Sequence, residues 1–219
     1  LLLDPYFYRI LNSKLYFCAK LNKKTNPGDE KSSVGGNICD MKRVRLRDRE
    51  FRLLIEAEVI DREIERVARQ MNEELAGESP LFIGVLNGAF MFVSDLLKQI
   101  TVEGTEISFV KIASYDKLVS TGNVQSVIGL KEDISGRTVV ILEDMVDTGE
   151  SMIYLKRMLE EKHPKLIKIA AMFYKPDALR YDLTLDYTCI ALEKDFVIGR
   201  GLDYDGLGRN LPDLYTIEN

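Results

Sequence analysis

Short apolar runs alternate with helix-like stretches between residues 60 and 192. Runs such as Leu81–Leu86 and Val139–Leu142 end at turn-forming or charged residues, which is typical of strands buried on both faces of a parallel sheet. Between such runs the apolar positions recur every three or four residues, as in an amphipathic helix that ends before Gly77 and carries Ile60, Ile64, Val67, Met71 and Leu75. The pattern predicts an α/β fold with a twisted, mostly parallel sheet flanked by helices.

The remaining elements follow from the same two patterns. One further helix is expected to turn four residues toward the core, Phe90, Val93, Leu97 and Ile100. Another helix follows Ser151 and carries Met152, Leu155, Met158 and Leu159. Strands are expected at 107–112, 127–130, 166–174 and 187–192. The polar stretch from Ser114 to Gln125 is either an ordinary surface connection or a mobile flap.

Residues 1–40 differ from the rest of the chain. They are rich in Asn and turn-forming residues and include the polar tract at 32–37, whereas Met41 opens a segment with clear periodicity. We expect residues 1–40 to be an extension or upstream sequence, with Met41 as the true or alternative start. The alternative is a native arm that packs on a partner subunit. Residues 41–219 are expected to form one domain.

Composition narrows the classes of partner and compartment. The formal net charge of −5 and the pI of about 5.2 argue against broad binding to nucleic acid or to anionic membranes. Cys18, Cys39 and Cys189 are scattered and lack metal-ligand spacing, which favours reduced thiols in a cytoplasmic protein. The single histidine, His163, makes a Ser-His-Asp triad or a multi-histidine metal site improbable.

The segment after Val139–Leu142 concentrates the candidate chemistry. Glu143 and Asp144 come at the end of the run and Asp147 follows them. Ligands of open α/β sheets bind outside the carboxyl ends of the strands, so these three acids are expected at a ligand site. Ionised Glu143 and Asp144 suit the hydroxyls of a ribose or a hydrated Mg²⁺ ion, and Asp147 is a candidate general base.

Residues 148–151 lie where a loop is expected to enter a helix. The free amides of Thr148, Gly149, Glu150 and Ser151 can therefore bind one anion such as a phosphate monoester, and Gly149 permits close approach of the backbone. The alternative interpretation is a strand end with solvated acids and a helix N-cap.

The sequence of residues 141–151, Ile-Leu-Glu-Asp-Met-Val-Asp-Thr-Gly-Glu-Ser, resembles the phosphoribosyl-pyrophosphate motif of the type I phosphoribosyltransferases. The resemblance implies their fold with a small hood subdomain, a phosphoribosyltransferase domain over residues 41–219, Mg²⁺ as cofactor and a homodimer or homotetramer. It also implies that ribose and the 5′-phosphate are bound by Glu143, Asp144, Asp147, Thr148, Gly149, Glu150 and Ser151.

Other segments resemble the bacterial hypoxanthine-guanine branch of this family. Residues 85–92, with Asn87 and Gly88, resemble its pyrophosphate loop, and Ser114-Tyr115 resembles its flexible closing loop. The resemblance assigns the purine to Lys175, Phe196, Val197 and Asp203, pyrophosphate to Arg209 as well, and metal to Glu143, Asp144 and Asp203. Taken alone, Phe196 is more often a core residue and Lys175 a solvated strand end.

The implied reaction is purine salvage, in which the phosphoribosyl group of phosphoribosyl pyrophosphate moves to hypoxanthine or guanine with Asp147 as the catalytic residue. Three positions depart from the family pattern. Asn87 stands where many relatives have Lys or Arg, Glu150 puts an acid in the phosphate loop, and Asp195 is another variable position. A xanthine-preferring enzyme is one alternative. A regulator that binds phosphoribosyl pyrophosphate without catalysis is the other.

Overall fold

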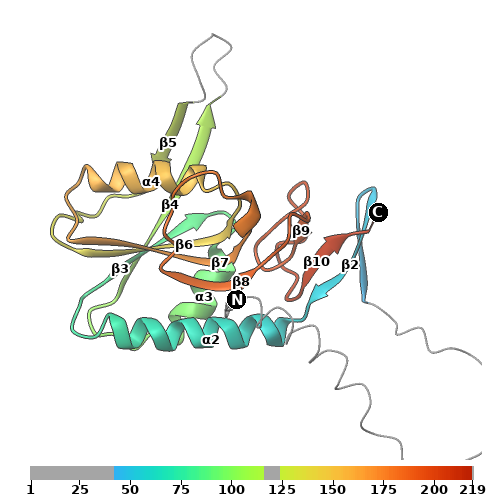
Figure 1. Ribbon diagram of the computed structural model, residues 1–219, viewed down its shortest axis with the longest axis horizontal. Coiled ribbons are helices and arrows are strands. Elements are labelled where there is room, and N and C mark those ends of the chain that lie inside the picture. The colour runs from blue at the N-terminus through green and yellow to red at the C-terminus, as the bar shows by residue number, and fades with distance from the viewer. Residues whose placement is uncertain (1–41, 116–123, 219) are drawn as a thin grey trace, which may run out of the picture. The chain divides into compact units, whose positions relative to one another are not determined.

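The computed structural model describes residues 42–115 and 124–218 (Figure 1). The extension predicted for residues 1–40 and the start predicted at Met41 lie outside these ranges. None of the helices within them is both long enough and apolar enough to cross a membrane.

The larger of two sheets carries the predicted strand–helix alternation. Its strand order is β5-β4-β3-β6-β7-β8, and all neighbours pair parallel except β5 with β4. This confirms the mostly parallel sheet. The strands are β3 (Leu81–Leu86), β4 (Glu106–Tyr115), β5 (Val124–Ile128), β6 (Thr138–Val146), β7 (Leu166–Tyr174) and β8 (Tyr187–Ala191).

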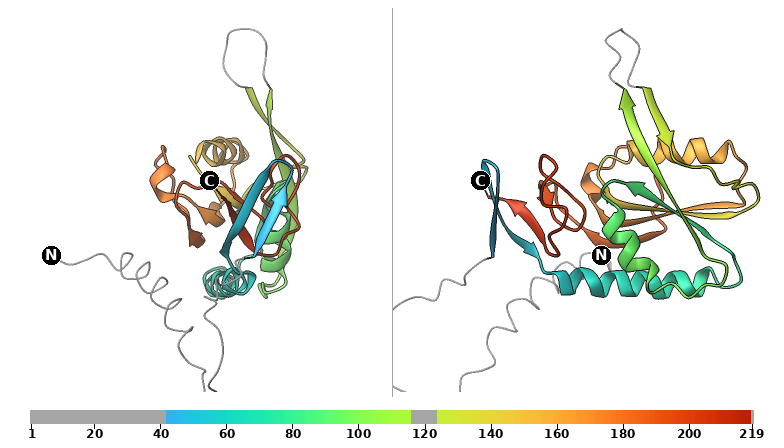
Figure 2. Two further views of the ribbon diagram at one scale, coloured as in Figure 1. Left: turned by 90° about the vertical axis from the view of Figure 1, so that its right-hand side faces the viewer. Right: turned by 180° about the vertical axis from the view of Figure 1, so that it is seen from behind.

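Helices cover both faces of this sheet (Figures 1 and 2). Successive residues of a strand point to opposite faces, so each central strand contributes to two separate cores. Phe82 and Leu142 pack with α2 (Ala57–Glu74) and α3 (Phe90–Leu97) in one core, whereas Ile83 and Ile141 pack with α4 (Glu150–Glu160) in the other. This two-sided burial explains why β3 and β6 are almost uniformly apolar.

The predicted facing of α3 is correct for Val93, Leu97 and Ile100, which pack against the core, but wrong for Phe90. Phe90 is 43% exposed, and the buried residues of this eight-residue helix are Phe92, Val93 and Leu96. The helix begins at Phe90 itself, and Phe92 and Leu96 are buried in addition to the predicted Val93. The short strand expected at 127–130 also begins earlier, at Val124, because β5 is fixed by antiparallel pairing with the end of β4.

A second, antiparallel sheet forms the small hood that the family resemblance implied. Its order is β1-β2-β10-β9, with strands β1 (Arg43–Leu46), β2 (Arg49–Ile55), β10 (Leu214–Ile217) and β9 (Val197–Ile198). Phe51, Ile198 and Tyr215 are its buried core. Two segments that are far apart in the sequence therefore build one layer beside the ends of β6 and β7 (Figure 2).

Candidate active site

The two acids of β6 occupy different environments. Asp144 is buried and its Oδ1 accepts a hydrogen bond of 2.9 Å from the amide of Met145. Glu143 is half-buried, and its Oε2 is a buried atom without a hydrogen-bond partner. Burial, followed by the neighbouring Asp144 carboxylate, raises the pKa of Glu143 well above its ordinary range. Burial also raises the pKa of Asp144.

The turn after β6 presents the start of a helix to the same edge of the sheet. Gly149, with φ of 85°, is the N-cap residue of the 11-residue helix α4. A Cβ at this position would lie 3.2 Å from Leu183, and left-handed backbone disfavours any other residue there. Thr148 Oγ1 accepts a hydrogen bond of 3.4 Å from the Glu150 amide, whereas the Glu150 and Ser151 side chains are exposed. Such a helix start attracts anions through its amides and its dipole.

Lys175 and Asp147 form an ion pair at the ends of adjacent strands. Lys175 Nζ lies 3.2 Å from Asp147 Oδ2, and the lysine amide donates to the Val146 carbonyl. Lys175 is only 9% exposed, so it is not the solvated strand end considered from the sequence. Asp147 remains about half exposed and can therefore reach a ligand.

A pocket of about 210 Å³ opens between this edge and the hood. Of the residues that line it, all except Met145 and Leu202 were predicted site residues. The lining consists of Asp144, Met145, Asp147, Lys175, Phe196, Val197, Leu202, Asp203 and Arg209. The fold thus gathers residues from three regions of the chain into one cavity.

The hood wall of the pocket is aromatic and charged. Phe196 is 46% exposed rather than a core residue, and its ring lies 6.0 Å from that of Tyr204 and 6.4 Å from that of Phe51. Asp203 Oδ1 lies 2.5 Å from an amino group of Arg209, and its Oδ2 accepts a hydrogen bond of 2.7 Å from the Gly206 amide. The wall offers a flat apolar surface next to a fixed carboxylate–guanidinium pair.

The turn after β3 approaches both walls through its backbone. Gly88 is buried, and a Cβ on it would overlap the Asp144 carboxylate. A Cβ on Gly201 of the hood would in turn overlap the Gly88 carbonyl. The Leu86–Asn87 peptide bond is cis, and the Asn87 side chain is exposed and outside the pocket lining. Glycine at 88 and 201 is therefore required by close packing.

Comparison with known proteins identifies the family of this chain. Residues 55–205 match the model of the phosphoribosyl transferase domain. The chain is 35% identical over 162 residues to the hypoxanthine-guanine phosphoribosyltransferase of Streptococcus thermophilus, which covers 74% of this chain and 89% of the relative. The chain belongs to the phosphoribosyltransferase family.

Solved phosphoribosyltransferase structures agree in fold. A hypoxanthine-guanine phosphoribosyltransferase from Bacillus anthracis is similar with a TM-score of 0.69 and 28% identity, over 76% of this chain and 96% of that one. A mutant of the hypoxanthine phosphoribosyltransferase of Trypanosoma cruzi, solved as a ternary complex with substrates, is also similar. Its TM-score is 0.70 and its identity 28%, over 76% of this chain and 94% of that one. The type I phosphoribosyltransferase fold predicted from residues 141–151 is thereby confirmed.

Some predicted residues of this phosphoribosyltransferase lie outside the pocket lining. Glu143, Glu150 and Ser151 belong to the adjoining strand and helix start, and Gly88 underlies Asp144. The backbones of Ser114 and Tyr115 pair with β5 at the end of β4, but their side chains and residues 116–123 are outside the described part of the chain.

Sequence reasoning missed the support behind Phe196. Tyr204 donates a hydrogen bond of 2.9 Å to Asp48 Oδ1, and Phe51 packs beneath both rings. The signal was present in the sequence. Apolar residues recur at every second position at 44 and 46 and again at 51, 53 and 55, which is the period of a half-buried hairpin.

The residues of the pocket fit a magnesium ion. Within residues 42–115 and 124–218 no three His, Cys, Asp or Glu side chains converge on one point. Mg²⁺ needs no such cage, since it commonly takes one or two carboxylates together with waters and substrate oxygens. Asp144 and Asp203 line the same pocket, and the neighbouring Glu143 has a carboxylate oxygen, Oε2, without a hydrogen-bond partner.

Proposed function

We propose that this protein transfers the 5-phosphoribosyl group of phosphoribosyl pyrophosphate to N9 of hypoxanthine or guanine, releasing pyrophosphate and forming IMP or GMP for purine salvage. The observation that carries the proposal is the pocket in which the Asp147–Lys175 pair faces the ring of Phe196. The names of the relatives from Streptococcus thermophilus and Bacillus anthracis support the same substrates.

The base is recognised by hydrogen-bond polarity and by stacking. The ammonium group of Lys175 can only donate, so it favours the 6-oxo group of hypoxanthine or guanine over the 6-amino group of adenine. The exposed ring of Phe196 stacks on the purine and the backbone of Val197 hydrogen-bonds to its edge. Asp147 interacts with N7 and holds or accepts its proton during transfer.

The sugar and its phosphate bind on the side of β6 and α4. The amides of Thr148, Gly149, Glu150 and Ser151 bind the 5′-phosphate at the start of α4. Glu143 and Asp144 bind the ribose hydroxyls, for which ionised carboxylates are suitable acceptors.

The pyrophosphate lies between the turn after β3 and the hood. Asn87 and Gly88 offer backbone groups, and Arg209 offers a guanidinium that Asp203 already orients. Glu143, Asp144 and Asp203 would hold Mg²⁺, which would neutralise charge on the leaving pyrophosphate. Ser114 and Tyr115 close over the site and exclude water from the reactive sugar.

The assembly is a homodimer or homotetramer in the cytoplasm. Large apolar side chains are left exposed on α3 and β4, namely Phe90, Ile107 and Phe109, and this supports burial against another copy. Cys189 is a free thiol, which suits a reducing compartment. Light scattering on the eluting protein measures the subunit number, and a monomer at assay concentration would refute the assembly.

The purified protein should be incubated with Mg²⁺, phosphoribosyl pyrophosphate and hypoxanthine, guanine, xanthine or adenine separately. We expect IMP and GMP together with released pyrophosphate. Product from xanthine alone would replace the proposal with a xanthine-preferring enzyme. Binding of phosphoribosyl pyrophosphate without product from any base would replace it with a regulator.

A further inference from the structure

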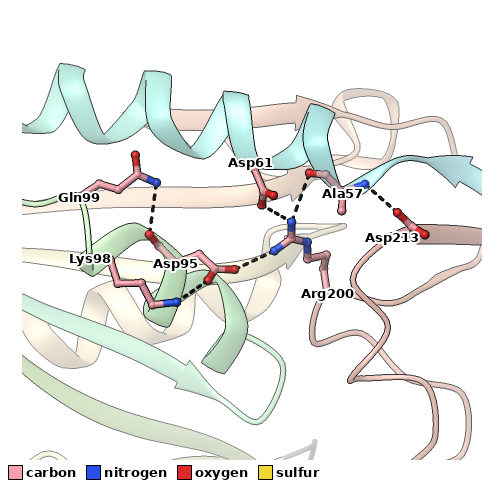
Figure 3. A network of polar contacts seen from close by, with 7 residues as sticks. All are labelled: Ala57, Asp61, Asp95, Lys98, Gln99, Arg200 and Asp213. Carbon is pink, nitrogen blue, oxygen red and sulfur yellow. Dashed lines mark hydrogen bonds and ion pairs between the residues drawn. The ribbon is translucent and has the colours of Figure 1, made fainter.

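Arg200 is a buried charged residue for which the proposed reaction has no role. It is 5% exposed and follows β9 in the hood, separated from it by Gly199. Its guanidinium reaches out of the hood to α2 and α3, the two helices that cover one face of the large sheet (Figure 3). One amino group donates a hydrogen bond of 2.7 Å to Asp95 Oδ2, and the other contacts Asp61 Oδ1 and the Ala57 carbonyl.

Each contact joins Arg200 to an element next to the site. Asp95 belongs to α3, the helix that follows the Asn87–Gly88 turn, and Ala57 and Asp61 belong to the first turns of α2. Asp213 of the hood accepts a hydrogen bond of 2.8 Å from the Ala57 amide, so Ala57 is held by both of its backbone groups (Figure 3). The hood is thereby fixed to α2 and α3.

The backbone after Arg200 enters the pyrophosphate side of the pocket. Gly201 packs against the Gly88 carbonyl too closely for a Cβ. The Gly201 carbonyl accepts a hydrogen bond of 2.7 Å from Arg209, which in turn pairs with Asp203. A shift of residue 200 would therefore move Gly201, and with it the Arg209 guanidinium, away from Gly88.

The base side of the hood has a separate anchor. The Phe196 carbonyl accepts hydrogen bonds from the Thr216 hydroxyl and the Ile217 amide, and Val197 pairs with Thr216 of β10. These contacts do not involve Arg200. The hood residues proposed to bind the base and those proposed to bind pyrophosphate are therefore anchored by different contacts.

The backbone of Arg200 is also held in a disfavoured conformation. Its φ of 53° lies in the left-handed region, which non-glycine residues adopt only when their surroundings enforce it. The contacts of the buried guanidinium with two carboxylates and a carbonyl hold the backbone of Arg200 in this conformation. Without the ion pairs the loop is expected to relax.

We propose that Arg200 is a positioning residue that holds the hood loop against the Gly88 turn and thereby sets the affinity for phosphoribosyl pyrophosphate and pyrophosphate, but not for the base. This inference rests on the proposed function. Arg200→Met keeps the aliphatic part of the side chain and removes the contacts to both aspartates. Arg200→Lys retains the positive charge, so its loss of affinity for phosphoribosyl pyrophosphate is expected to be smaller than that of Arg200→Met.

The matched control is Arg47→Met. Arg47 also has left-handed backbone, with φ of 51°, and pairs with Asp205 of the same hood, but both partners are exposed. Exposed pairs contribute little, so this variant should keep the wild-type kinetics. Asp95→Asn removes the negative charge of one partner of Arg200 but keeps a carbonyl acceptor, and it serves as a second, milder test.

The experiment measures kcat and the KM of each substrate for both directions of the reaction, with phosphoribosyl pyrophosphate binding measured by calorimetry. We expect Arg200→Met to raise the KM for phosphoribosyl pyrophosphate and for pyrophosphate about tenfold or more, since displaced groups near a site lose activity steeply. The KM for hypoxanthine should change less than twofold (a rough margin) because β10 holds Phe196 and Val197 independently.

Equal losses for base and phosphoribosyl pyrophosphate, or an effect no larger than that of Arg47→Met, would overturn the assignment. If Arg200→Met does not fold, Arg200→Lys and Asp95→Asn must show the same selective rise in KM, and unchanged values overturn it. Wild-type protein without turnover on any purine would instead refute the proposed function, so the two failures are distinguishable.

Discussion

Lys175 Nζ lies 3.2 Å from Asp147 Oδ2, across the ends of two neighbouring parallel strands. The lysine is buried and the aspartate is about half exposed. The pair therefore combines a fixed donor with an acid that can still contact a ligand.

Asp147→Asn should lower kcat by roughly 10²–10⁴, the range typical of general acid–base groups, while the fold is retained. The amide cannot hold the N7 proton, although it keeps the shape of the side chain. Asp177→Asn is the matched control, because Asp177 is an exposed acid in the short 3-10 helix that follows Lys175. Steady-state kinetics and circular dichroism check both variants, and wild-type turnover in Asp147→Asn would remove its catalytic role.

Lys175→Gln should raise the KM for hypoxanthine and guanine at least tenfold, as expected when a buried donor to the substrate is weakened. The KM for phosphoribosyl pyrophosphate should stay near wild type. Lys168→Gln is the control on the same strand, since Lys168 pairs with Glu74 away from the pocket. A similar change in both variants would contradict base recognition by Lys175.

Gly88→Ala should abolish most binding of phosphoribosyl pyrophosphate, because the added Cβ would overlap the Asp144 carboxylate and displace either the turn or the acid. Gly77→Ala provides the comparison. It introduces a strained left-handed alanine where no atom lies within 4 Å, so it should lower stability by about 1 kcal/mol without changing kinetics. Calorimetry with the ligand and urea unfolding distinguish the two effects.

Glu143→Gln should make the ligand-free protein more stable at neutral pH. The folded-state pKa of Glu143 is raised, so the proton on this group stabilises the fold below the ordinary value near 4.5, and that stabilisation is lost as the pH rises through the folded pKa. The variant does not ionise at this position, and its advantage in unfolding midpoint should grow with pH across that window. Urea unfolding at a series of pH values measures it, and a constant difference would contradict the assignment. Activity should fall, because Glu143 is proposed to bind ribose.

Phe196→Leu should raise the KM for the purine and leave that for phosphoribosyl pyrophosphate unchanged, because the flat stacking surface is lost. Phe109→Leu, at an aromatic residue of β4 with similar exposure, is the control. Inhibition by free purines gives an independent measure of base affinity. Equal effects of the two substitutions would contradict stacking on Phe196.

The sequence was most informative where local pattern and local structure coincide. The predicted bounds of β3 and β7 match the structure, since both strands are apolar runs limited by turns. The motif at 143–151 could likewise be interpreted from adjacent residues. By contrast, Lys175 was assigned to this site only through family resemblance, because no periodicity reports which strand ends meet. Its ion pair with Asp147 was not predicted.

Other features depend on tertiary packing and could not be predicted. The side of α3 that is buried is decided by its docking on the sheet, which left Phe90 exposed. Arg200 lies between glycines in a segment that looks like a flexible loop, and its partners Asp61 and Asp95 are distant in sequence. Only the fold shows that this arginine is buried.

The hood strands also have a consequence for synthesis of the chain. β1 and β2 precede the whole parallel sheet, whereas β9 and β10 follow it, so the hood sheet has the longest-range pairings in the domain. During translation the acids of β6, the start of α4 and Lys175 emerge before β10, the second partner strand of β2, exists. The half proposed to bind the sugar phosphate can therefore be assembled on the ribosome first, and the purine half is completed only when β10 pairs with β2.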